Sequence, residues 1–290
     1  MSCTLFEFTV AEQNNGGDLR TFLRRSCGIT ARSLTVLKYG DGGIYCGDDP
    51  IRTNEIVYTG DVICVCLPEE SNPIVPIAGV LNVIYEDEYI LVVNKPPHMP
   101  VHPTKDHQMD TLANIISYYQ QGRGESYVFR ALNRLDKDTS GCVILAKDRL
   151  SYALVKDTVK KTYVAVCEGI IDSEGTIDRP VALAEGSKIK RCVSDGGSPA
   201  ITHYRPLATG RGHTLLELHL ETGRTHQIRC HMSSIGHPLA GDDLYGGRRD
   251  CIGRQALHCQ SIRFLHPVTK KEIALQTAIP SEFLHIIGEC

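Results

Sequence analysis

A carboxylate stands directly before a buried strand in residues 131–148, ALNRLDKDTSGCVILAKD. The middle of this stretch is charged and turn-prone, whereas residues 142–146 form an unbroken apolar run typical of a core strand. Asp136 follows Leu135, which can anchor the loop in the core. A surface turn has this composition, and so does a loop that holds a catalytic carboxylate at the mouth of a site. Asp138 suits the turn better, so Asp136 is the candidate for chemistry.

A second candidate cluster is ETGRTHQIR, residues 221–229, which contains Arg224, His226 and Arg229. Two arginines, a histidine and a glutamine within six residues are denser than a solvated surface needs, and such donors suit recognition of phosphates and base edges. The pattern predicts a helix that starts near residue 224. His226 and His231 are five residues apart and do not share a helix face as HExxH ligands do, so no metal site is predicted.

Tyr163 is the third candidate, because it precedes the apolar strand of KKTYVAVCEG. A tyrosine in this position is usually a core residue with a satisfied hydroxyl. It also suits stacking on a nucleic-acid base. The residues alone leave both interpretations open.

Several classes of protein are excluded or disfavoured by the motifs that the sequence lacks. It contains no GxxxxGK[ST], no GxGxxG after a strand and no GxSxG, so we expect no nucleotide cofactor. The twelve cysteines include no CxxC pair, and no apolar run is long enough to span a membrane. No secretory signal pattern is present. We therefore expect a cytoplasmic protein without cofactor or metal.

The chain divides into three parts by composition. Residues 1–70 form a small α+β unit, in which Asp18 and Thr30 are placed to cap two helices. This unit holds six Lys and Arg against ten Asp and Glu, while the whole chain has a net charge of -3. Residues 71–80 contain two prolines and no period, which indicates a linker. Residues 81–290 form the main domain.

The main domain is rich in strands, expected at residues 90–94, 142–146, 162–169 and 214–221. Helices are expected after residue 110 and over residues 224–236. Strands outnumber helices and do not alternate with them regularly, which favours an α+β fold with a mostly antiparallel mixed sheet.

Five segments in order resemble one protein family. They are VIYEDEYILVVNKPPHMPVHP, RLDKDTSGCVILAKD, KKTYVAVCEG, ETGRTHQIRCHMSSIGHPLAGDDLYG and RQALHCQSIRFLHPVTKKEI. Together they resemble the RluA family of RNA pseudouridine synthases over about residues 81 to 285. The first seventy residues look like an S4-type RNA-binding domain, although its acid excess departs from the usual basic character. Asn133 stands where the family often has histidine.

The resemblance implies the isomerisation of uridine to pseudouridine in structured RNA, ribosomal or transfer RNA, without a cofactor. It implies that Asp136 is the catalytic carboxylate, that Arg224 is its charge partner, and that Tyr163 stacks on the flipped base and helps to remove the C5 proton. Arg134 is expected to fill the gap that the base leaves. The remaining expected RNA contacts are Lys161, His226 and Arg229. We expect a monomer.

Two alternatives stay open at the level of the sequence. One is an RNA-binding protein of the same fold without turnover, against which the intact catalytic residues argue. The other is a glycoside hydrolase that uses Asp136 and Asp138. Two carboxylates so close on a tight turn seldom reach the separation of about 5 Å or more that flanks one sugar.

Overall fold

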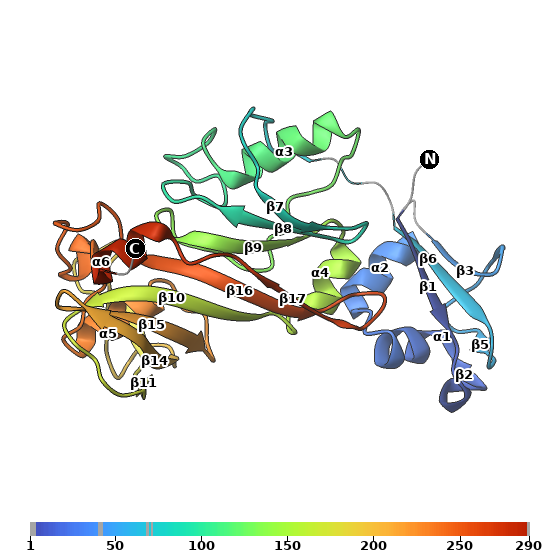
Figure 1. The fold of residues 1–290 in the computed structure, drawn as a ribbon. Coiled ribbons are helices and arrows are strands. Elements are labelled where there is room, and N and C mark those ends of the chain that lie inside the picture. Colours follow the sequence, from blue (N-terminus) through green and yellow to red (C-terminus); the bar gives the residue numbers. More distant parts are fainter. Residues whose placement is uncertain (1–3, 40–42, 68–69, 71, 289–290) are drawn as a thin grey trace.

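The computed structural model describes residues 4–39, 43–67, 70 and 72–288. The ribbon shows a small N-terminal unit beside a larger part rich in strands (Figure 1). In the N-terminal unit, β1 (Thr4–Thr9), β6 (Val62–Leu67), β3 (Gly43–Cys46) and β4 (Asp49–Pro50) form one sheet in this order, and β2 (Gly17–Asp18) pairs with β5 (Ile56–Val57). Its helices are α1 (Leu19–Thr21), which continues into a π-helical turn over Phe22–Ser26, and α2 (Ala31–Tyr39).

The two predicted helix caps of this unit are confirmed. The Asp18 carboxylate accepts a hydrogen bond from the backbone N–H of Thr21 at 3.0 Å. The Thr30 hydroxyl accepts one from the backbone N–H of Ser33 at 3.1 Å. Each cap satisfies a backbone donor that the first turn of a helix leaves unpaired.

A nine-stranded sheet dominates the main domain. Its order is β11 (Gly175–Asp178), β14 (Ile201–Gly210), β15 (His213–Leu220), β10 (Lys160–Glu168), β16 (Leu257–Leu265), β9 (Ser140–Ala146), β8 (Ile90–Lys95) and β7 (Val83–Glu86), with β17 (Glu272–Gln276) also paired to β16. Among the described strands, β9 and β16 pair in parallel and the other neighbours are antiparallel. The predicted α+β fold with a mostly antiparallel mixed sheet is confirmed.

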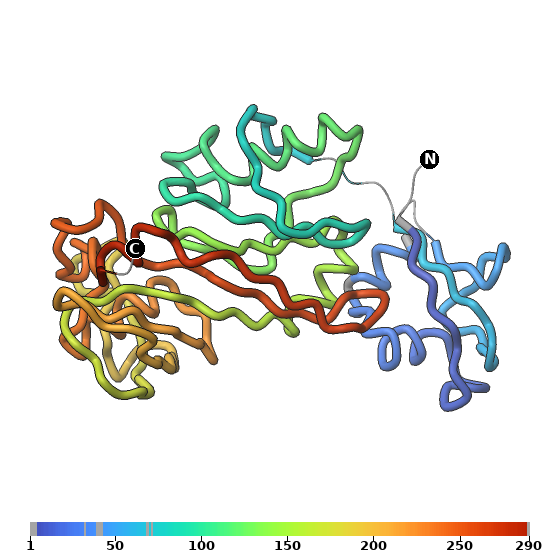
Figure 2. The backbone as a smooth tube through the Cα atoms, viewed as in Figure 1, coloured from blue at the N-terminus to red at the C-terminus, as the bar shows by residue number. Residues whose placement is uncertain are grey.

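The parallel contact between β9 and β16 is short. It covers His258 opposite Ser140 and Cys259 opposite Gly141, and β16 then pairs with β17. The sheet therefore divides beyond this point, as Figures 1 and 2 show for β7–β9 on one side and β16–β17 on the other. Asp136 lies just before β9 at this division.

The described part of the domain also contains four α-helices, a 3-10 turn over Asp243–Tyr245 and a small hairpin. The helices are α3 (Leu112–Gly122), α4 (Arg149–Val155), α5 (Gln227–Ser234) and α6 (Ser281–Ile287), and the hairpin pairs β12 (Val181–Leu183) with β13 (Arg191–Val193). Side chains alternate along β10, so Val164 and Val166 pack in one core cluster with Phe283 of α6. Tyr163 belongs to the other cluster, which includes Ile228 of α5. The alternation of a strand thus places Tyr163 on the side of α5.

The N-terminal unit packs directly on the main domain. Leu150 of α4 is completely buried and belongs to the N-terminal core, and Leu154 packs beside it. The rings of Phe6 and Tyr89 lie 5.0 Å apart between their centroids. Glu70 forms ion pairs with two arginines of the main domain, Arg130 and Arg149.

The segment predicted as a linker is tied to α3, with residue 71 outside the described residues. The Asn72 amide donates to the Ser117 hydroxyl at 3.3 Å. The Asn114 amide, buried in α3, donates to the carbonyl of Val75 at 2.9 Å. These bonds fix the path by which the chain leaves the N-terminal unit.

We predict that deletion of residues 1–72 leaves the main domain folded but less stable, because every strand of the large sheet lies beyond residue 80. The deletion removes the N-terminal core that covers Leu150, and fully burying a leucine stabilises a protein by about 1.5–3 kcal/mol. Thermal unfolding of both forms measures the loss. The same deletion with Leu150→Gln and Leu154→Gln is the control and should remain monodisperse. A truncated protein without a cooperative transition would contradict the prediction.

Candidate active site

The loop that carries Asp136 is fixed at both ends. Leu135 is buried in the main core, and the backbone N–H of Thr139 donates to the Asp136 carbonyl at 3.1 Å, which closes a tight turn. Immediately after the loop, Gly141 has a φ of +112°, and a Cβ on it would lie 2.2 Å from the Cys259 carbonyl oxygen. Only glycine allows β9 to cross β16 so closely. The Asp136 side chain, 27% exposed, is left at the mouth of a hollow.

Arg229 is the cation that faces Asp136. Its Nη1 donates to Asp136 Oδ2 at 3.3 Å, while Nε and Nη2 donate to the two oxygens of buried Asp242 at 2.6 and 2.8 Å. Burial opposes the positive charge, but the hydrogen bonds and charge of Asp242, followed by the charge of Asp136, raise the pKa of Arg229. A permanent cation is therefore held within reach of Asp136.

The sequence predicts Arg224 as the partner of Asp136, whereas in the structure the arginine hydrogen-bonded to Asp136 is Arg229. The Arg224 Nε donates instead to the Pro199 carbonyl at 3.1 Å. The difference arises because the helix starts later than predicted. His226 adopts a left-handed conformation with φ 56°, so α5 starts at Gln227. Arg229 is consequently the residue of the first turn that points at Asp136, and its contact with RNA phosphate stays a prediction.

His226 lies beside the same carboxylate. Its Nδ1 is 3.0 Å from the Tyr245 hydroxyl, and its Nε2 is 3.7 Å from Asp136 Oδ2. Burial lowers the pKa of His226, although the negative charge of Asp136 opposes this effect. The lowered pKa favours a neutral imidazole at neutral pH, so Arg229 supplies the positive charge of the site.

A narrow cavity of about 60 Å³ opens between Asp136 and Tyr163. Its walls include the apolar side chains of Leu220, Ile228 and Leu257. Burial, followed by the charges of Cys259 and Asp136, raises the pKa of Tyr163 well above its usual value. The tyrosine is therefore a neutral phenol that lines the cavity, and its side chain is hydrogen-bonded to Cys259.

Of the other predicted residues, Arg134 and Arg224 line the cavity and Lys161 does not. Arg134 is exposed at the mouth. Lys161 lies in β10 opposite Ile262. A wider hollow of about 610 Å³ adjoins the cavity and shares Asp136 with it.

Three residues that hold the site together were not predicted to do so from the sequence. Asp242 lies in a loop so tight that a Cβ on Gly247 would come within 1.9 Å of a carbonyl oxygen. Asn133 bridges to β9, donating to the Cys142 carbonyl at 3.0 Å and accepting from the N–H of Ile144 at 2.9 Å. An acid between glycines, as in AGDDLYGG, was the available signal for Asp242.

The third missed residue, Lys95, is fully buried at the end of β8. Its Nζ donates to the carbonyls of Pro96, Met99 and Lys137 at 2.8, 2.8 and 3.1 Å. Burial lowers the pKa of Lys95 to about 7. Lys95 thus joins the loop after β8 to the Asp136 loop. The available signal in the sequence was a lysine at the end of an apolar run.

Comparison with known proteins identifies the family of this chain. A family model described as RNA pseudouridylate synthase matches residues 89–234. The chain is 40% identical over 247 residues to the uncharacterised RNA pseudouridine synthase YhcT of Bacillus subtilis, with 82% of each chain covered. It is 33% identical over 300 residues to the ribosomal large subunit pseudouridine synthase D of Neisseria meningitidis, covering 97% of this chain and 80% of the relative. The chain belongs to the RluA family of RNA pseudouridine synthases.

A solved human structure, RNA pseudouridylate synthase domain containing 1, matches with a TM-score of 0.56 and 27% sequence identity over 69% of this chain and 84% of that chain. The predicted enzyme class, an RNA pseudouridine synthase and thus an isomerase that acts on RNA, is confirmed.

In the described part of this pseudouridine synthase, no helix is long and apolar enough to cross a bilayer. The described His, Cys, Asp and Glu residues form no group of three or more that could hold a metal ion. The cytoplasmic location, the monomeric state and the absence of a cofactor stay predictions.

We predict that Arg229→Met lowers the rate of pseudouridine formation by about 10²-fold. Loss of the cation leaves the Asp136 carboxylate without its charge partner, so the dependence of the rate on pH should change. Single-turnover rates across pH measure both effects. Arg224→Met should keep the wild-type pH dependence, and the reverse result would restore Arg224 as the partner.

A matched control separates chemistry from folding. Arg229→Met leaves Asp242 buried and unpaired, which costs about 3–5 kcal/mol of stability. The double variant Arg229→Met with Asp242→Leu removes both charges, and it should regain thermal stability without regaining the rate. Recovery of both would show that Arg229 acts only on stability.

Proposed function

We propose that this enzyme converts uridine in structured RNA to pseudouridine with Asp136 as the catalytic carboxylate. The observation that carries this proposal is that Asp136, with Arg229 at 3.3 Å, lines the same cavity as Tyr163. A carboxylate entering a closed pocket tends to become protonated, and the adjacent cation counters this tendency.

The reaction is balanced without a cofactor. The bond between N1 of uracil and C1′ of ribose breaks, the uracil turns, and C5 bonds to C1′. The C5 proton leaves and N1 gains a proton, so no atom is added to the RNA. In this proposal Asp136 acts on the ribose, either as nucleophile at C1′ or as the group that takes a proton from the sugar.

The cavity suits a flipped uracil. The Tyr163 ring and the apolar walls formed by Leu220 and Ile228 offer surfaces for stacking. Removing the base from its helix costs a few kcal/mol. Arg134, exposed at the mouth, is the side chain that we assign to the gap in the RNA.

The proposed RNA is ribosomal. This choice follows the printed name of the relative from Neisseria meningitidis, a ribosomal large subunit pseudouridine synthase that matches 97% of this chain. Transfer RNA is the other class in the family. Mapping of pseudouridine in cells with and without this gene decides between them.

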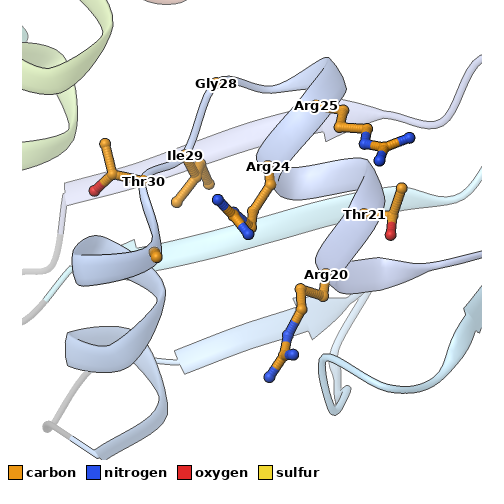
Figure 3. Close-up of a pocket in the computed structure, with 8 residues that line it drawn as sticks. Arg20, Thr21, Arg24, Arg25, Gly28, Ile29 and Thr30 are labelled. Atoms are coloured by element: carbon orange, nitrogen blue, oxygen red, sulfur yellow. The ribbon is translucent and has the colours of Figure 1, made fainter.

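We also propose that the N-terminal unit is an S4-like domain that contacts the RNA. Although the unit is acidic overall, its basic side chains gather around a hollow of about 550 Å³ lined by Arg20, Arg24 and Arg25. Figure 3 shows Arg20 and Arg24 pointing toward the side of α2, while Arg25 points away. An adjoining hollow adds Lys38. Local positive charge of this kind suits an RNA phosphate backbone.

We predict that Asp136→Asn lowers turnover by more than about 10³-fold while the melting temperature is kept. The amide preserves the shape of the side chain but lacks its charge and basicity. Release of tritium from RNA that carries it at C5 of uridine measures the reaction. Turnover within tenfold of wild type would remove Asp136 from catalysis. A wild-type protein that binds RNA but releases no tritium would instead indicate a binding protein without turnover.

We predict that Tyr163→Phe lowers the rate by about 10²-fold while RNA binding is unchanged. The ring can still stack, but the hydroxyl that burial keeps protonated is lost from the route of the C5 proton. Filter binding and single-turnover rates separate the two roles. Equal rates for tyrosine and phenylalanine would show that the residue only stacks.

A further inference from the structure

Arg254 is a buried arginine that fastens the Asp136 loop to the C-terminal helix. It belongs to the segment RQALHCQ and is only 4% exposed. Its Nη1 donates to the Asp138 carbonyl at 3.0 Å, and its Nε donates to Glu282 of α6 at 3.0 Å. It takes no part in the ion pair of Asp136 with Arg229.

The same segment holds the next two residues of the loop as well. The Gln255 amide donates to the Thr139 hydroxyl at 3.3 Å. The Arg254 Nη2 donates to the Ser140 hydroxyl, also at 3.3 Å. Three consecutive residues, 138 to 140, are therefore hydrogen-bonded to side chains that lie more than a hundred residues later in the chain.

Ser140 belongs to a chain of hydrogen bonds in which every donor and acceptor can be assigned. Thr277 donates its hydroxyl to the Gln260 carbonyl at 3.1 Å, so its oxygen is free to accept from His258 Nε2 at 2.8 Å. His258 Nδ1 then accepts from the Ser140 hydroxyl at 2.8 Å, and the Ser140 oxygen accepts from Arg254. Burial, aided by the charge of Arg254, lowers the pKa of His258 to about 4, which keeps the imidazole neutral as this chain requires.

We propose that Arg254 is a positioning residue that sets the aim of Asp136 through the Asp138 carbonyl, and that Glu282 orients Arg254. The proposal rests on the function proposed for Asp136. The gripped carbonyl lies two residues after Asp136 in a turn that the Thr139 N–H closes, so a shift of one moves the other. A displacement of about 1 Å in a reacting group can cost about 10²-fold in rate.

Glu282, which binds Arg254, is held in place because its helix α6 is packed in the core. Phe283 is completely buried, and the Arg254 guanidinium lies over its ring at 5.2 Å. Figure 2 shows the segment after β17 running back along β16 to bring α6 to this end of the molecule. The last helix of the chain thus supports the loop of the active site.

The test compares Arg254→Met, Arg254→Lys and Glu282→Ala in the full-length enzyme. Single-turnover tritium release across pH gives the rate, filter binding gives RNA affinity, and amide hydrogen exchange of residues 136–141 reports the loop without RNA. Arg211→Met is the matched control, because Arg211 donates to the His285 carbonyl of α6 at 3.0 Å and binds nothing in the loop.

We expect Arg254→Met to lower the maximal rate by about 10- to 100-fold. RNA affinity and the pH at which the rate rises should be unchanged, since Arg229 still faces Asp136. Exchange in the loop should become at least about tenfold faster. Arg254→Lys should recover part of the rate, because an ammonium group can still donate to the Asp138 carbonyl. Glu282→Ala should lose about three- to tenfold, and Arg211→Met should match wild type.

A folded Arg254→Met enzyme with a rate and loop exchange within twofold of wild type would overturn the proposal. So would an equal loss in Arg211→Met, or a pH dependence shifted as in Arg229→Met. If Arg254→Met does not fold, Glu282→Ala decides by the same criteria. If the wild type is inactive, the function proposed for Asp136 fails, while the exchange data still decide whether Arg254 fixes the loop.

Discussion

The buried guanidinium of Arg229, bound between two carboxylates, is the interaction on which the site depends. Moving such a cation out of water costs several kcal/mol unless hydrogen bonds and an opposite charge offset the loss. Asp242 supplies both in a bidentate pair and leaves Nη1 directed at Asp136. Because the cation is held rigidly by Asp242, the Asp136 loop has to be aligned to it, and the neighbouring structure is organised to do so.

Several backbone features follow from this constraint. Helix α5 starts at Gln227 after the left-handed His226, and a start one residue away would turn Arg229 by about 100° around the helix axis. Gly141 lets β9 cross β16 in near contact. Buried Lys95 and Arg254 bind carbonyls of Lys137 and Asp138 on the loop. The loop is thereby held by two buried side chains that donate to its backbone and do not hydrogen-bond to the Asp136 carboxylate.

The N-terminal unit illustrates a limit of composition. Its excess of acids predicts weak RNA contact, but the number of charges does not show where they lie on the surface. The fold collects Arg20, Arg24 and Lys38 around adjoining hollows. Likewise, the segment after residue 71 has the composition of a linker, yet Asn114 of α3 binds the Val75 carbonyl. The composition of a segment indicates its local flexibility, whereas its attachment to the rest of the fold depends on residues elsewhere in the chain.

The sequence by itself determined the features that local periodicity and burial encode. These are the core strands, the capped N-terminal helices, the charged loop of Asp136 before an apolar run, and the position of Tyr163 in a strand. The tertiary structure decided which arginine faces Asp136, because the two residues are 93 positions apart and a shift in helix start exchanges one arginine for another. It also decided the parallel contact of β9 with β16 and the grip of Arg254. Such contacts depend on how distant segments cross, and this geometry leaves no periodic signal in the chain.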